Sequence, residues 1–195
     1  MSPYTALQLD ALRELANIGS GTASSALSAM LGRPVDISVP NALVLPMADA
    51  VDAAGPGETD VTGIVLGVVG DMEATVVLLV SPADAARICT MLGVDADSEL
   101  GLSALQEIGN ILGSSYVNAL AGMTGLNVEP TPPSAATDML AAIVASVLAE
   151  RAGGVDTTLM LDSALVIEGE NCTISFMLVP DRGAVELMLA GLGLA

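Results

Sequence analysis

Two sets of polar residues each place an acid and an amide at helical spacing. The sets are Asp10, Glu14 and Asn17, and Ser103, Glu107 and Asn110. Within each set the spacing is i, i+4 and i+7, which puts all three side chains within about 60° on an α-helix. An amide can orient a water molecule for attack on a phosphoryl group. A carboxylate can bind a cation on a partner protein.

Other chemistries fit these two sets less well. Neither set has a histidine, cysteine or lysine near it in the sequence, so a nucleophile–base pair for acyl transfer is unsupported. One helical stripe also offers too few oxygen ligands for a metal ion, and we expect no metal site. For a single set, the ordinary interpretation would be the solvated face of an amphipathic helix.

The two sets belong to a longer internal repeat. Each set is followed, after 22 further residues, by a proline, Pro40 in the first copy and Pro133 in the second. Core and turn positions repeat at the same offset of 93 residues, among them Leu12 with Leu105, Leu27 with Leu120, Met30 with Met123 and Gly32 with Gly125. Such an offset indicates a duplication, and duplicated halves usually pack about a pseudo-twofold axis. The polar sets persist although their flanking residues have diverged, which favours a function for both.

The sequence predicts the same order of elements in each half. In the first half we expect a helix from about 5 to 31, a strand over 35–45 interrupted at Pro40, and a loop over 49–60. Two apolar runs at 62–69 and 73–80 predict a hairpin, and Pro82 opens a helix to residue 92. On the first helix, Leu12, Leu15, Ile18, Thr22 and Ala26 are expected on one buried side. Gly19 and Gly21 suggest a close approach of another backbone.

In the second half, Ser103 and Gln106 form a capping-box pattern ahead of a helix to about 124. This helix is followed by a strand over 128–137 and by a helix over 139–150 that has no counterpart in the first half. We then expect a hairpin at 158–168 and 172–179 and a last helix over 181–192. We therefore predict an α+β fold of two similar halves related by a pseudo-twofold axis. They would share one antiparallel sheet with helices packed on it, in a single domain with repeats at about 5–94 and 100–193.

The charge balance is strongly acidic, with 23 Asp and Glu residues against five Arg and no Lys, for a net charge of −18. Phosphates would be repelled, so we expect neither nucleic acid nor an anionic membrane as a partner. The alternatives are an acidic face for one partner or adaptation of the whole surface to a salty cytosol. The scattered acids favour the second, because at molar salt the Debye length falls to about 3 Å.

Cys89 and Cys172 are the two cysteines of the chain. Without a basic n-region at the N-terminus, we expect a cytoplasmic protein with two free, buried thiols. The longest apolar run, over 139–149, has 11 residues and is too short to span a bilayer, so we expect no membrane insertion.

The paired motif resembles the CheC group of chemotaxis phosphatases, which is related to CheX and to the flagellar switch protein FliY. The segments that carry the resemblance begin at Asp10 (DALRELANIG) and Ser103 (SALQEIGNIL), with further likeness at 36–40 and 116–120. The resemblance covers essentially the whole chain. It implies hydrolysis of the aspartyl phosphate on the response regulator CheY, with Mg²⁺ held by the regulator and no cofactor on this chain.

The resemblance also implies roles for the motif residues. Asn17 and Asn110 would orient the attacking water, and Glu14 and Glu107 would contact a lysine of the regulator. Asp10 and Ser103 occupy the motif's variable first position and would have a supporting role.

Phosphorylated CheY is therefore the expected partner, and the deamidase CheD a second one. The alternatives are a non-catalytic module that sequesters or regulates CheD or CheY, and a flagellar-switch-like component.

Overall fold

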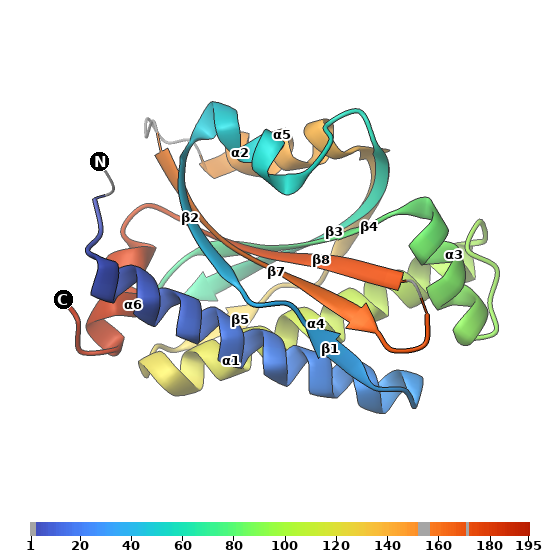
Figure 1. Cartoon of the computed structure of the whole chain (residues 1–195), viewed down its shortest axis with the longest axis horizontal. Helices are drawn as coiled ribbons and strands as arrows, with labels where there is room; N and C mark the ends of the chain where they lie inside the picture. Colours follow the sequence, from blue (N-terminus) through green and yellow to red (C-terminus); the bar gives the residue numbers. More distant parts are fainter. Residues whose placement is uncertain (1–2, 152–156, 171) are drawn as a thin grey trace.

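The computed structural model describes residues 3–151, 157–170 and 172–195. The chain forms three layers with one antiparallel sheet in the middle (Figure 1). Helices α1 (Ala6–Leu31) and α4 (Glu99–Thr124) lie side by side on one face of the sheet and run in opposite directions. Helices α2 (Met47–Ala54) and α5 (Leu140–Arg151) cover the other face. Helices α3 (Pro82–Met91) and α6 (Ala184–Gly191) lie at the two ends.

The strand order of the sheet confirms the predicted α+β fold with two related halves. The strands of the first half are β1 (Val35–Ile37), β2 (Asn41–Pro46), β3 (Asp60–Gly70) and β4 (Ala74–Val80). Those of the second half are β5 (Val128–Pro130), β6 (Ser134–Met139), β7 (Thr157–Ile167) and β8 (Cys172–Pro180). The order is β1-β7-β8-β4-β3-β5, with β2 also on β7 and β6 also on β3. Exchanging equivalent strands of the two halves reverses this order and leaves it otherwise unchanged, as a pseudo-twofold axis between β4 and β8 requires.

The two halves are interlocked through their edge strands. Strands β1 and β2 pair with β7 of the second half, and β5 and β6 pair with β3 of the first half. The central pair β4 and β8 joins the halves along the axis. Each half thus completes the sheet of the other. The assignment to one domain with repeats at about 5–94 and 100–193 stays a prediction.

Alternate residues of the central strands serve two separate cores. In β4, Val76 and Leu78 face the core under α1 and α4, whereas Val77 and Leu79 face the core under α2 and α5. All seven residues of β4 are buried. Burial on both faces explains why this strand appears in the sequence as a continuous apolar run.

The two long helices begin at equivalent hydroxyl caps. The Thr5 hydroxyl accepts from the Gln8 amide at 3.2 Å, and Ser98 Oγ accepts from the Gly101 amide at 3.0 Å. The capping box predicted at Ser103 is therefore wrong. A cap at Ser98 followed by acidic Glu99 starts α4 one turn earlier, which leaves Ser103 inside the helix. A capping box does form, but at Thr5.

Three further predictions need correction. The loop expected over 49–60 contains α2, so the helix at 139–150 has a counterpart in the first half after all. Its counterpart is four residues shorter, at 8 against 12 residues, and two aspartates interrupt its apolar pattern. The last helix begins at Ala184, after Gly183 in the left-handed region. Finally, Ile18 and Thr22 are exposed rather than buried, because α1 packs through the face of Leu12, Leu15 and Gly19.

The two long helices approach each other closely at Gly19. A Cβ built there would lie 2.7 Å from the ring of Tyr116 on α4. The close neighbour is thus an aromatic side chain and not the backbone that the glycine pattern suggested. At Gly21 the nearest atom, on Ile37, is 4.0 Å away, so that glycine fills no comparable contact.

Candidate functional site

The polar stripes lie on the outer faces of α1 and α4. Glu14 and Glu107 are exposed, and Asn17 and Asn110 are half-buried. Because the two helices run in opposite directions, the stripes, which occupy the N-terminal parts of their helices, point to opposite ends of the helix pair (Figure 1). The chain therefore presents two separate surfaces that each carry an acid and an amide.

The second stripe and its proline line one surface hollow. This hollow has a volume of about 390 Å³ and is lined by Ser103, Gln106, Glu107, Asn110 and Pro133. The structure thus brings together all four residues that the sequence motif connects in this half. This open surface exposes a carboxylate, an amide and a hydroxyl together, so a partner protein can contact all three at once.

The first stripe differs in its surroundings. A hollow of about 560 Å³ beside it is lined by Asp10 and Arg13, together with Ala6, Leu7 and Leu9. Arg13 forms an ion pair with Asp10 at 3.0 Å. The equivalent residues of the second copy, Ser103 and Gln106, are uncharged. Glu14, Asn17 and Pro40 do not line this hollow, and Pro40 is buried.

A pair of hydroxyl residues that the sequence analysis did not single out anchors the loop before each proline. The Ser38 amide donates to the Ala164 carbonyl at 2.8 Å, and the Ala164 amide donates back to Ser38 Oγ at 2.8 Å. In the second half, Thr131 makes the same two bonds with Gly67 at 2.8 and 2.9 Å.

These anchors fix the prolines against the sheet strand of the other half. Ser38 and Thr131 are 93 residues apart, so the repeat offset itself was the signal that could have identified them. The hydroxyl two residues before each proline takes the place of a backbone partner and holds the loop to β7 or β3.

One carboxyl group near Pro40, that of Asp162, has a raised pKa. Asp162 pairs in register with Asn41, the first residue of β2. Burial raises the pKa of the Asp162 carboxyl, and a hydrogen bond with the Asn41 side chain lowers it in part. Asp162 belongs to neither polar stripe, and its equivalent strand position in β3 is apolar.

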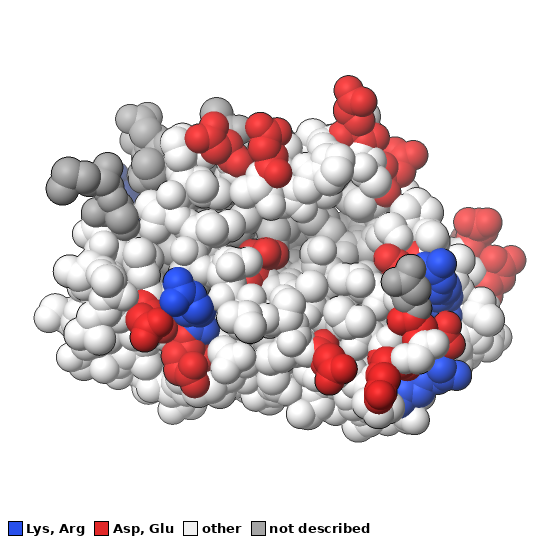
Figure 2. Space-filling view, viewed as in Figure 1, with Lys and Arg blue, Asp and Glu red and all other residues white. Residues whose placement is uncertain are grey.

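Charge is distributed over the surface. Figure 2 shows acidic side chains on several separate parts of one face, with few basic ones among them.

Both cysteines are buried and free. Among the described residues, no three histidine, cysteine or acidic side chains cluster closely enough to hold a metal ion. In the same part of the chain, no helix is both long and apolar enough to cross a membrane.

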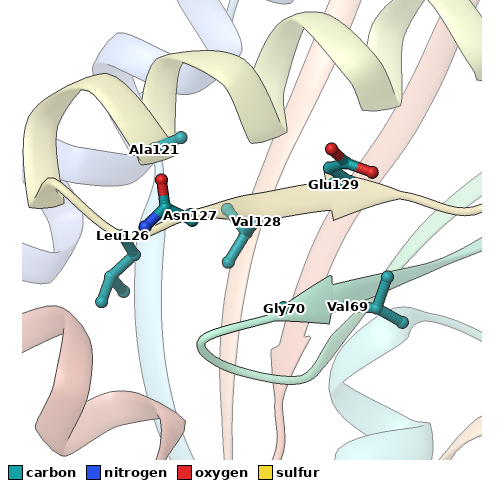
Figure 3. A pocket seen from close by; sticks show the side chains of 7 residues that line it. All are labelled: Val69, Gly70, Ala121, Leu126, Asn127, Val128 and Glu129. Atoms are coloured by element: carbon teal, nitrogen blue, oxygen red, sulfur yellow. The ribbon is translucent and has the colours of Figure 1, made fainter.

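A further hollow of about 360 Å³ lies beside β5 (Figure 3). It is lined by Val69 and Gly70 of β3, by Ala121 of α4, and by residues 126–129. The Asn127 amide donates to the Asp71 carboxylate at 2.8 Å, which closes one end of the β3–β4 turn onto β5. None of the predicted site residues lines it.

Comparison with known proteins identifies two copies of one family pattern. The model of the CheC-like family matches residues 7–44 and 100–136, and each match includes one polar stripe. The CheY-P phosphatase CheC of Bacillus subtilis is 30% identical over 95% of this chain and 94% of its own length. The flagellar motor switch phosphatase FliY of the same organism is 29% identical over 65% of this chain and 35% of its own length.

The fold comparison agrees with the sequence comparison. The crystal structure of Thermotoga maritima FliY superposes with a TM-score of 0.77 over 98% of both chains, at 20% identity. At that identity the likeness concerns the fold alone. The two motif matches and the full-length similarity to B. subtilis CheC together show that this chain belongs to the CheC-like family.

Proposed function

We propose that this chain is a phosphatase that hydrolyses the aspartyl phosphate of the response regulator CheY. The observation that carries the proposal is the exposed acid/amide pair on each of two equivalent helices, in a chain 30% identical to the CheY-P phosphatase CheC of B. subtilis. Each pair would enter the phosphorylation pocket of one regulator molecule.

The proposed mechanism divides the work between the two side chains. Asn17 or Asn110 orients the water for in-line attack on phosphorus, and Glu14 or Glu107 binds a lysine ammonium at the pocket. The phosphorus–oxygen bond to the aspartyl carboxylate breaks, and inorganic phosphate leaves with the water oxygen. Mg²⁺ held by CheY would neutralise charge on the phosphoryl group, and no residue of this chain is proposed as its ligand.

Half-burial of the two amides supports this division. An amide seated against its helix has fewer rotamers to lose than a fully exposed one, and it can hold a water in a defined direction. The exposed carboxylates have the reach that a contact with a partner requires. Asp10 and Ser103 support the stripe from its N-terminal end.

The proposal extends to the setting of the protein. Net charge of −18 and the absence of lysine support a salt-adapted protein, whose acids are screened at molar salt. The two free, buried cysteines support a reducing, cytoplasmic setting. CheD is proposed as a second partner on the family resemblance.

Decay of phosphorylated CheY, measured with and without this protein at molar salt, tests the proposal. We expect faster decay with the wild type and none of that acceleration with the Asn17→Ala, Asn110→Ala double variant. Thermal stability of the variant should change little, because surface substitutions usually cost less than about 0.5 kcal/mol. Glu14→Gln with Glu107→Gln should weaken engagement while keeping the side-chain shape.

Two results would contradict the proposal. Full acceleration by the asparagine double variant would exclude the water-orienting role. Binding of phosphorylated CheY by the wild type without any acceleration of decay would instead indicate a sequestering module.

A further inference from the structure

An exposed leucine precedes each polar stripe by about one helical turn. Leu7 and Leu100 stand three residues before Asp10 and Ser103, at the second position of α1 and α4. Their exposed fractions are 65% and 64%. A single exposed leucine needs no explanation. The same residue with the same exposure at equivalent points of two diverged halves is a shared feature of both sites.

Helix geometry places these leucines on the same face as the acids. At about 100° per residue, Leu7 and Glu14 differ by only about 20° around α1, and Ile18 lies about 40° from Glu14. Ile18 is 41% exposed. Glu14 therefore lies in one row between two exposed apolar side chains. Leu7 also lines the hollow beside Asp10, which connects the row to the first stripe.

The second helix repeats the row. Leu100, Glu107 and Ile111 have the same spacing on α4, with Leu100 exposed and Ile111 half-buried. We refer to Leu7 with Ile18, and Leu100 with Ile111, as the apolar rows. By the same helix geometry, each row lies along one side of its acid while the amide lies on the other side.

A row of this kind suits a strongly acidic protein at high salt. Charge steering between exposed groups fades when the Debye length is about 3 Å. Salts that are excluded from protein surfaces strengthen apolar burial. Apolar side chains before and after a carboxylate along the helix also exclude water from its contact on docking, which strengthens that contact. An apolar contribution close to the acid would therefore retain affinity as the salt concentration rises.

We propose that the apolar rows bind phosphorylated CheY beside each acid/amide pair and set the KM of the reaction. This inference rests on the proposed function and assigns it a docking surface. The rows act by positioning the regulator and touch neither the phosphoryl group nor the water.

The test replaces both leucines, because each site has its own. In Leu7→Ala with Leu100→Ala, we expect KM for phosphorylated CheY to rise about tenfold at molar salt, with kcat unchanged. Leu102→Ala is the matched control. Leu102 is 39% exposed on the first turns of α4 but lies about 160° around the helix from Leu100. The KM of the Leu102→Ala variant should therefore stay within about twofold of the wild-type value. Leu7→Met with Leu100→Met should restore the wild-type KM.

The outcomes separate this inference from the proposed function. If the wild type hydrolyses phosphorylated CheY and the alanine variant has an unchanged KM, the docking role of the apolar rows is refuted and the proposed phosphatase activity stands. If the wild type does not hydrolyse phosphorylated CheY, the docking role is tested by calorimetric titration of the wild type and the alanine variant with beryllofluoride-activated CheY. Weaker binding by the alanine variant then supports the rows, and equal binding overturns them. A change of oligomeric state in the variant without CheY, seen by sedimentation, would show that the leucines bind a second copy instead.

Discussion

Replacing Gly19 by alanine should destabilise the protein, whereas the same change two residues later should stabilise it. The new Cβ at position 19 would lie 2.7 Å from two ring carbons of Tyr116. Carbon atoms pack at about 3.5–4.0 Å, so the ring has to retreat by about 1 Å. Tyr116 is 1% exposed and its ring centroid lies 4.7 Å from that of Phe176, so the ring has to move within a packed core.

The magnitude follows from two opposing effects. Overpacking of a filled core costs about 1–3 kcal/mol. Replacing a helical glycine by alanine gains about 1 kcal/mol from backbone propensity. Gly19→Ala should therefore lower the free energy of unfolding by about 0–2 kcal/mol. At Gly21 the nearest atom is 4.0 Å away, so Gly21→Ala keeps the gain of about 1 kcal/mol.

Thermal unfolding of both variants in molar salt provides the assay. Each kcal/mol should shift Tm by about 2–4 °C in a chain of this size. We expect Gly21→Ala above the wild type and Gly19→Ala below it. In a Tyr116→Leu background, Gly19→Ala should cost less than it does in the wild type, as expected for two residues in contact. Equal stabilisation by the two alanines would refute the close packing of α1 against α4 at Tyr116.

Two further predictions concern the loop anchors and a buried thiol. Thr131→Ala removes the acceptor of the part-buried Gly67 amide and should cost about 1 kcal/mol, measured by denaturant unfolding, with Thr131→Ser as the rescue. Ser38→Ala should cost less, because its bond to the Ala164 amide is exposed and water can replace it. Burial, with a smaller contribution from Asp84, raises the pKa of the Cys172 thiol from 9.0 to about 12. The unfolded chain then loses this proton at lower pH than the folded chain, so the thiol's contribution to stability falls as pH rises from about 9 to 12. Thiol labelling of Cys89→Ala at pH 9 should stay slow until the protein unfolds, and rapid labelling of the folded protein would contradict the burial of Cys172.

The sequence by itself determined the features that depend on local spacing. The 93-residue offset predicted two related halves, and the i, i+4, i+7 spacing put Glu14 and Asn17 on one helical face. Apolar runs broken by short turns predicted both hairpins, β3–β4 and β7–β8. These features could be predicted because period and turn chemistry act within a few residues along the chain.

Only the tertiary structure decided how the halves combine. Pairing of β1 and β2 with β7 of the other half is invisible in a repeat, because equivalent strands carry equivalent patterns. The exposure of Ile18 depended on which face of α1 meets the sheet, and the role of Thr131 depended on Gly67 lying opposite it in space. Each of these is a long-range contact, and a one-dimensional pattern does not specify which partner satisfies it.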